Sequence, residues 1–160
     1  MAAGTTYFPI ATTTLGSNQA SVTFSSIPAT YTDIVVIATG KTSTETTLYF
    51  RFNGDSGSNY SSTDIYGDGS AAGSFRFSNS SEMYFYNWKN SESNAIFNIQ
   101  NYANTTTFKT VLARTNGSTS YATAVVGLWR STAAINQLLI HSNDTFISGS
   151  TFTLYGIEYA

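Results

Sequence analysis

Hydrophobic and polar residues alternate along most of this chain, in short segments that end at turn-forming residues. In the segment 48–52, Leu48, Phe50 and Phe52 fall on one face, with more polar side chains between them. Clusters of Gly, Asn, Asp and Ser separate such segments every ~8–12 residues. No segment has the composition of the long helices that βαβ units need. The pattern therefore predicts an all-β fold, a jelly-roll-like two-sheet antiparallel β-sandwich.

The expected strands and core follow from this alternation. Strands are predicted at Ile10–Leu15, Ala20–Ser25, Asp33–Gly40, Leu48–Phe52, Phe75–Phe77, Met83–Trp88, Asn94–Tyr102, Phe108–Arg114, Tyr121–Trp129, Ile135–Ile140 and Phe152–Ile157. The side chains predicted to fill the core are Val36, Phe50, Phe52, Phe97, Ile99, Leu112, Val126, Leu139, Phe152 and Leu154. In Asp33–Gly40, four successive apolar residues indicate a strand covered on both faces.

The segment Thr46–Ser70 begins as a strand and continues into a run rich in glycine, asparagine and aspartate. Residues 53–59 tolerate positive φ or bond to their own backbone, and Gly67–Gly69 forms a second turn. Between these turns, Tyr60 and Tyr66 supply large side chains that a flexible linker would not carry. The pattern predicts a long, structured loop whose aromatic residues anchor it at the rim of a sheet.

Composition excludes several classes of partner. Of the 160 residues, 15% are aromatic and only 10% are charged, which is unlike a disordered chain or a helical bundle. The formal net charge is −2 and the cations are spread singly, so no basic surface for nucleic acid or anionic lipid is expected. No apolar run approaches the ~20 residues of a membrane span. A chain without cysteine has no disulfide or thiolate metal site.

A single sandwich domain over residues 11–160 is expected, preceded by an N-terminal arm over residues 1–10. Tyr7, Phe8 and Ile10 form an apolar group at this end of the chain. Two interpretations remain open for it: a terminal strand packed on its own sheet, or an arm that docks on a neighbouring subunit.

Catalytic groups are sparse in this sequence. His141 is the single histidine, and no Gly-x-Ser-x-Gly elbow accompanies it. Most acidic residues fall in turns, where solvation or local backbone bonds account for them, so the paired carboxylates of a glycosidase are not indicated. The sequence therefore predicts a non-enzymatic protein with no catalytic residue and no cofactor.

A calcium loop is an alternative interpretation of the segment 53–64. The residues at the 1-3-5-7-9-12 spacing of an EF-hand-like loop are Asn53, Asp55, Gly57, Asn59, Ser61 and Asp64. However, the first of these is not an acid, the third carries no side-chain oxygen, and flanking helices are missing. Turn chemistry explains the same residues, so we predict no metal site here.

Aromatic side chains suit either sugar stacking or a subunit interface. The candidates are Tyr49, Tyr60, Tyr66, Tyr84, Tyr86, Trp88, Tyr102 and Trp129. In Met83–Trp88 aromatic residues alternate on both faces, so one set must meet something other than the core. We favour an interface between subunits over a glycan site.

Several segments resemble a group of small structural proteins of tailed bacteriophages, especially those of cyanobacteria and marine bacteria. The matching segments are Phe24–Asp33, Leu48–Ser61, Gly127–Trp129 with Ala134–Ile135, and Gly149–Ile157. The Asn-Gly-Asp…Asn-Tyr-Ser stretch and the Gly-Ser-x-Phe-x-Leu-Tyr-Gly-Ile ending are the most specific of these. The resemblance implies a virion protein with a jelly-roll-like fold, and it brings no catalytic or metal residue.

The expected function is that of a trimeric capsid decoration (cement) protein on the outer surface of the virion, made in the host cytoplasm. It would bridge major capsid proteins, with no nucleic acid or membrane as partner. The alternative is a receptor- or glycan-binding module of a phage tail fibre. The residues predicted as contact surfaces are Tyr7, Phe8, Ile10, Tyr49, Arg51, Tyr60, Tyr66, Tyr84, Tyr86 and Trp88.

Overall fold

A computed structural model describes residues 6–117 and 121–158, with the backbone alone for Tyr86 and Asn87. Within these ranges, twelve strands form two antiparallel sheets and no helix occurs. The larger sheet contains, in spatial order, β1 (Tyr7–Thr14), β12 (Thr151–Ile157), β3 (Asp33–Gly40), β8 (Ser93–Ile99), β9 (Lys109–Gly117), β10 (Ala122–Trp129), β5 (Tyr60–Gly67) and β6 (Ala72–Ser80). The smaller sheet contains β2 (Gln19–Phe24), β11 (Leu138–Phe146), β4 (Thr46–Phe52) and β7 (Met83–Trp88).

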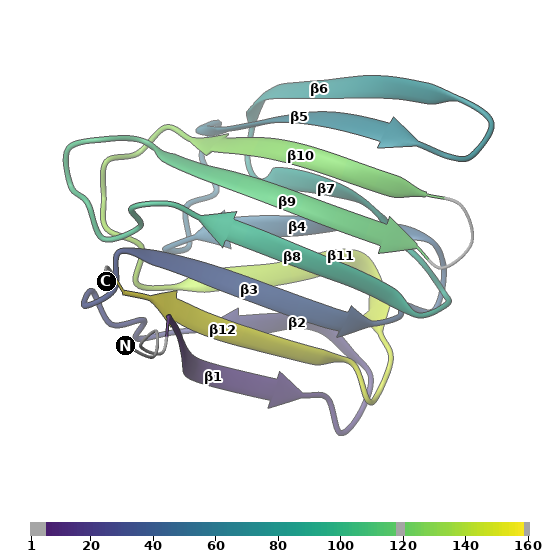
Figure 1. Ribbon diagram of the computed structural model, residues 1–160, viewed down its shortest axis with the longest axis horizontal. Helices are drawn as coiled ribbons and strands as arrows, with labels where there is room; N and C mark the ends of the chain where they lie inside the picture. Colours follow the sequence, from purple (N-terminus) through teal and green to yellow (C-terminus); the bar gives the residue numbers. More distant parts are fainter. Residues whose placement is uncertain (1–5, 118–120, 159–160) are drawn as a thin grey trace, which may run out of the picture.

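The strand order is that of a jelly roll with two added hairpins. The series β1-β12-β3-β8 and β2-β11-β4-β7 are the two four-stranded sheets expected when eight strands wind as a double Greek key. The hairpins β9–β10 and β5–β6 then continue the first sheet beyond β8, so the larger sheet extends past the jelly-roll core (Figure 1). The predicted all-β, two-sheet antiparallel sandwich is confirmed.

The core lies between the two sheets and is rich in aromatic rings. The ring of Phe50 on β4 lies 4.7 Å from that of Phe85 on β7 and 4.4 Å from that of Phe97 on β8. Phe52 packs against Trp129 of β10, with ring centroids 5.4 Å apart. The predicted core residues that are fully buried are Val36, Phe50, Phe52, Phe97, Ile99, Phe152 and Leu154.

The prediction of the core is wrong for Leu112 and Val126, which are 53% and 54% exposed. Both lie on the face of the larger sheet that is turned away from the smaller one. On β10 the inward positions are instead taken by Thr123, Val125, Gly127 and Trp129, all buried. Leu139, also assigned to the core, is half-buried on β11.

Gly127 explains part of this inversion. A Cβ at this position would lie 2.5 Å from the sulfur of Met83 on β7, so the Met83 side chain occupies the space that this glycine leaves free. A residue without a side chain contributes no apolar signal to the inward face of β10. The alternation of Ala124 and Val126 on the other face therefore dominates the sequence pattern.

The long loop expected after β4 is shorter than predicted, because residues 60–67 form β5. This strand pairs with β10 and β6 along its whole length. Its inward positions begin with Tyr60, Ser62 and Asp64, all buried. Two polar residues on the buried side hide the alternation from which a strand would have been predicted.

The N-terminal boundary also differs from the prediction. Residues 7–10, assigned to an arm, form the first half of β1, and Tyr7 and Phe8 pair with Ile157 and Gly156 of β12. This is the terminal-strand interpretation, in which the end of the chain packs on its own sheet. The described part of the sandwich therefore begins at Tyr7 rather than at residue 11.

Candidate functional site

The outer face of the eight-stranded sheet, defined as the side turned away from the smaller sheet, carries unusually exposed aliphatic side chains. In one row across the strands, Ile37 of β3 pairs with Ile96 of β8, and Ile96 pairs with Arg114 of β9. Ala124 of β10 and Ile65 of β5 continue this row. Ile37 and Ile65 are 38% and 63% exposed, although both belong to regular strands.

A second row runs beside the first. Val35 of β3 pairs with Asn98 of β8, and Asn98 with Leu112 of β9. Val126 of β10 and Thr63 of β5 complete the row. Because residues two apart on a strand lie on the same face, the two rows form one continuous surface that is mostly aliphatic.

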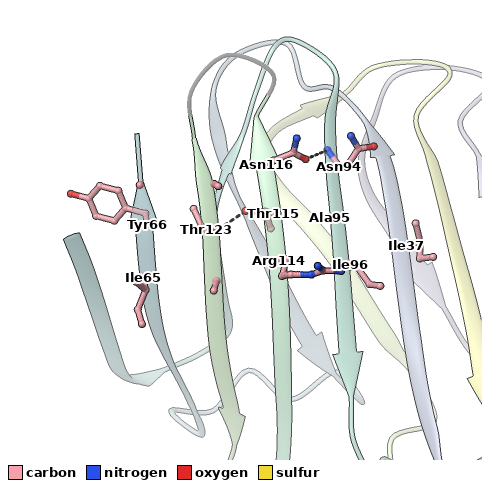
Figure 2. Close-up of a pocket in the computed structure, with 13 residues that line it drawn as sticks. Ile37, Ile65, Tyr66, Asn94, Ala95, Ile96, Arg114, Thr115, Asn116 and Thr123 are labelled. Atoms are coloured by element: carbon pink, nitrogen blue, oxygen red, sulfur yellow. Dashed lines mark hydrogen bonds between the residues drawn. The ribbon is translucent and has the colours of Figure 1, made fainter. Parts of the chain in front are cut away.

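An open hollow of about 770 Å³ lies over the first row. Its aliphatic lining includes Ile37, Ile96 and Ile65 (Figure 2). Arg114 extends from β9 across the face towards Ile96 (Figure 2). Beside the hollow, the backbone N–H of Asn94 donates a hydrogen bond to Oδ1 of Asn116, 3.2 Å away. The hollow thus combines an apolar floor with one cation and amide groups at one end.

The outer face of the smaller sheet carries a different, polar cluster. A single carboxylate oxygen, Oε2 of Glu82, lies 2.8 Å from both the Arg51 guanidinium and Nε2 of His141. The His141 ring stacks on Tyr49 at 5.1 Å, and the hydroxyl of Tyr49 accepts a hydrogen bond from Asn143 at 2.8 Å. Within the described residues, no serine or threonine hydroxyl bonds to His141. The cluster therefore holds β4, β7 and β11 together and does not present an activated nucleophile.

The turn after β4 is held by the carboxylate of Asp55. This carboxylate accepts hydrogen bonds from the indole N–H of Trp129 at 2.7 Å, the backbone N–H of Gly57 at 2.8 Å and the Asn59 amide at 3.0 Å. Burial opposes ionisation, but these donors outweigh it and lower the pKa of Asp55. The Asn-Gly-Asp…Asn-Tyr-Ser stretch thus forms a structural turn.

The same turn places its oxygen atoms unfavourably for a calcium ion. Both Asp55 carboxylate oxygens accept hydrogen bonds from donors, and Asp64, the twelfth position of the spacing, is buried in β5. In the described part of the chain, no group of three or more His, Cys, Asp or Glu residues could hold a metal ion. The turn chemistry favoured from the sequence accounts for these contacts.

We expect millimolar Ca²⁺ to leave the melting temperature unchanged to within about 1 °C, because an ion that binds the folded state would raise it. Differential scanning fluorimetry of protein pretreated with a chelator checks this expectation. Mg²⁺ at the same ionic strength is the matched control for general salt effects. A rise with Ca²⁺ alone would mean that the folded chain binds the ion, contrary to the prediction of no metal site.

Two buried ionisable groups were not expected from the sequence. Nζ of Lys109 donates to the carbonyl oxygens of Thr107 and Thr132, at 2.7 and 3.3 Å, and burial lowers its pKa. Asp64 is 2% exposed, and neither of its carboxylate oxygens has a hydrogen-bond partner within the described residues. Burial raises the pKa of Asp64 to about 6.

The predicted contact residues differ in how far they are exposed. Tyr49, Tyr60 and Trp88 are buried, Phe8, Ile10, Arg51, Tyr66 and Tyr84 are half-buried, Tyr7 is exposed, and the side chain of Tyr86 lies outside the described residues. Tyr60 and Trp88 are 0% exposed because they face the core, so neither forms a surface of this chain. The prediction is wrong for these two residues.

The exposed aliphatic residues of the outer face were not predicted from the sequence. A signal for them was present in β10, where Val125 and Val126 are adjacent and so place an apolar side chain on each face. β3 was predicted to be buried on both faces. On its outer face Val35 is buried, at 1% exposed, but Ile37 is exposed. In these strands, the apolar residues that face away from the core form an exposed surface and are not covered by a further layer of the protein.

No protein-family model and no curated protein matches this chain. Among the described residues, no helix is long and apolar enough to cross a membrane.

Proposed function

We propose that this protein is a non-enzymatic structural protein of a tailed-phage particle, a homotrimeric capsid decoration (cement) protein that bridges major capsid proteins. The observation that carries the proposal is the aliphatic outer face of the eight-stranded sheet. Ile65, Leu112 and Val126 are each more than half exposed there. Soluble monomers rarely expose contiguous apolar patches of this kind, so such a face is typical of a protein that works by contacting another protein.

The polar cluster supports a structural rather than a catalytic role. Glu82 is shared between Arg51 and His141, which leaves the imidazole already paired at Nε2. A general base must instead be within reach of a proton that it abstracts from a substrate. The resemblance of the Asn53–Ser61 and Gly149–Ile157 segments to phage structural proteins supplies the biological setting of the proposal.

The burial of aromatic side chains favours the capsid role over the tail-fibre alternative. A sugar-binding module needs exposed aromatic faces, but Trp88 and Trp129 are 0% and 2% exposed. Tyr60 is stacked on Trp129 with ring centroids 6.2 Å apart, inside the core. Tyr60, Trp88 and Trp129 therefore stabilise the sandwich and are not accessible for sugar stacking.

The proposal predicts a trimer in solution and a stabilised phage head. Light scattering at micromolar concentration should give three times the chain mass, and mass spectrometry should find the protein in separated heads rather than tails. Because a ligand that binds only the assembled shell stabilises it, heads lacking the protein should release DNA at a lower temperature. A strict monomer would contradict the trimer, and heads equally heat-resistant without the protein would contradict the cement role.

A further inference from the structure

Arg114 is a cation in the middle of an aliphatic surface. It lies in the row between Ile96 of β8 and Ala124 of β10. Its side chain is exposed, and within the described residues it makes no ion pair or side-chain hydrogen bond. A partner that covered this face with apolar groups alone would remove the water that hydrogen-bonds to the guanidinium and supply no acceptor in its place. Burying an unpaired charge in this way is costly in free energy. The occupant must therefore bring an acceptor to Arg114.

The charge of the outer face points to an acidic occupant. Arg76 of β6, paired with Thr63, lies on the same side of the sheet as Arg114 and is exposed. Three strand spacings separate the two arginines, which is about 15 Å. Asp33, at the end of β3, is half-buried and already accepts a hydrogen bond from the backbone N–H of Asn101 at 2.6 Å. Asp33 lies two rows along β3 from Ile37, at the edge of the face, so the centre of the face carries the positive charge of Arg114.

The uncharged part of the surface fits a protein segment better than a sugar. The exposed side chains around Arg114 are branched aliphatic groups, such as Ile37 and Val126, which pack against similar groups. The Tyr66 ring also lines the hollow, but it is already stacked between Phe75 and Tyr121. The side-chain amides of Asn94 and Asn116 stand at one end of the hollow (Figure 2). Such amides pair readily with the backbone groups of an extended peptide.

A second copy of this chain is a poor occupant for the same face. A two-fold axis through the middle of the face would bring Arg114 close to Arg114 of the other copy. Two guanidinium groups would then be desolvated together without an anion between them. The proposed trimer must accordingly use other surfaces, which leaves this face available for a different partner.

We propose that the outer face of the eight-stranded sheet binds an extended protein segment in which an aspartate or glutamate is flanked by aliphatic residues. The carboxylate pairs with Arg114, and the aliphatic side chains pack on the rows that contain Ile65 and Val126. This inference rests on the proposed function for the source of the segment, which is the protein shell that the trimers decorate. The chemistry of the segment follows from the face itself.

The test uses peptides of five residues with blocked ends, in which two valines and two isoleucines surround a central aspartate, asparagine or lysine. Each is titrated into the ¹⁵N-labelled full chain and followed by NMR. The aspartate peptide should shift amide signals of β8, β9 and β10, and the asparagine peptide should bind about tenfold more weakly. Equal binding of all three peptides, shifts confined to other strands, or no shifts at millimolar peptide would overturn the proposal.

Variants locate the interaction on the protein. Arg114→Gln should weaken binding of the aspartate peptide about tenfold. The aspartate and asparagine peptides should then bind this variant with equal affinity. Lys41→Gln, which removes the same charge at the end of β3, is the matched control and should bind as the unaltered chain does. If Val126→Glu instead dissociates an oligomer of the unaltered chain in sedimentation experiments, a second copy occupies the face and the proposal is wrong.

The same reagents separate this inference from the proposed function. Purified heads that lack the protein are mixed with the unaltered chain and with Arg114→Gln. If the chain does not bind heads but selects the aspartate peptide, the cement role fails and the binding face stands. If both proteins bind heads equally and the peptides are not distinguished, the cement role stands and the binding face fails.

Discussion

Replacement of Phe52 by alanine is expected to lower the free energy of unfolding by about 3–5 kcal/mol, the range for a fully buried phenylalanine. Phe52 is 0% exposed and contacts both Tyr60 and Trp129, which anchor the turn after β4 to β10. Its loss would leave a cavity that the paired strands on either side cannot collapse to fill. Urea denaturation measures the change as a lower midpoint at an unchanged slope. A midpoint that hardly moves would contradict the assignment of Phe52 to the core.

A pair of leucines provides the matched control for this first prediction. Leu154→Ala removes a side chain that is 0% exposed and should cost about 2–5 kcal/mol. Leu112→Ala removes the same atoms from a side chain that is 53% exposed. It should lower the free energy of unfolding by only about 0.5–1 kcal/mol. Equal losses for the two variants would mean that the outer face is covered in the isolated chain.

Strands with strict alternation on one face were predictable from the sequence. In β4, Leu48, Phe50 and Phe52 repeat every second residue, and all three are buried as expected. In β12, Phe152 and Leu154 behave in the same way. These strands belong to the jelly-roll core, where each is covered by the opposite sheet on one side only. Local alternation and the tertiary fold agree there, so the pattern suffices.

The added hairpins were harder to predict because their inward positions are not uniformly apolar. β5 places Ser62 and Asp64 inward, and β10 places Thr123 and Gly127 inward. Ser62 is accommodated because its hydroxyl accepts a hydrogen bond from the backbone N–H of Tyr84 at 3.0 Å. Such a contact joins two strands that are distant in the sequence, and no local pattern encodes it.

The candidate site could not be predicted for a related reason. Whether Leu112 or Val111 faces the core depends on which side of the eight-stranded sheet the four-stranded sheet covers, and both residues are aliphatic. The smaller sheet covers one side only, with β7 packed over β9, β10 and β5. An aliphatic second face therefore remains exposed. This face can be recognised as an exposed surface only once the structure shows that the smaller sheet covers the opposite face.

The Asp64→Asn variant is expected to remove a pH-dependent loss of stability. Burial raises the pKa of Asp64 from its usual value near 3.8 to about 6 in the folded chain. The folded state thus holds a proton that the unfolded state has released between about pH 4 and pH 6, so stability falls as the pH rises through this window. One pKa unit corresponds to about 1.4 kcal/mol, which makes the expected loss about 3 kcal/mol by pH 8.

The structural cause is the position of the carboxyl group. Asp64 lies opposite Val125 on β10 and Phe75 on β6, and within the described residues no donor reaches either oxygen. Asparagine has nearly the same shape but does not ionise, so its cost in the folded chain does not vary with pH. The stability of the variant relative to the unaltered chain should therefore rise by about 3 kcal/mol from pH 3.5 to pH 8, as urea midpoints at several pH values would measure.

Asp55→Asn is the control of opposite sign. Hydrogen bonds from Trp129, Asn59 and Gly57 lower the pKa of Asp55, so its ionised form stabilises the folded chain. That contribution is present above about pH 4 and is lost as the pH falls through the lowered pKa. The two variants should thus differ from the unaltered chain in different pH windows and in opposite directions. Parallel pH profiles for Asp64→Asn and the unaltered chain would show that Asp64 stays ionised in the fold, and that a donor or water reaches it there.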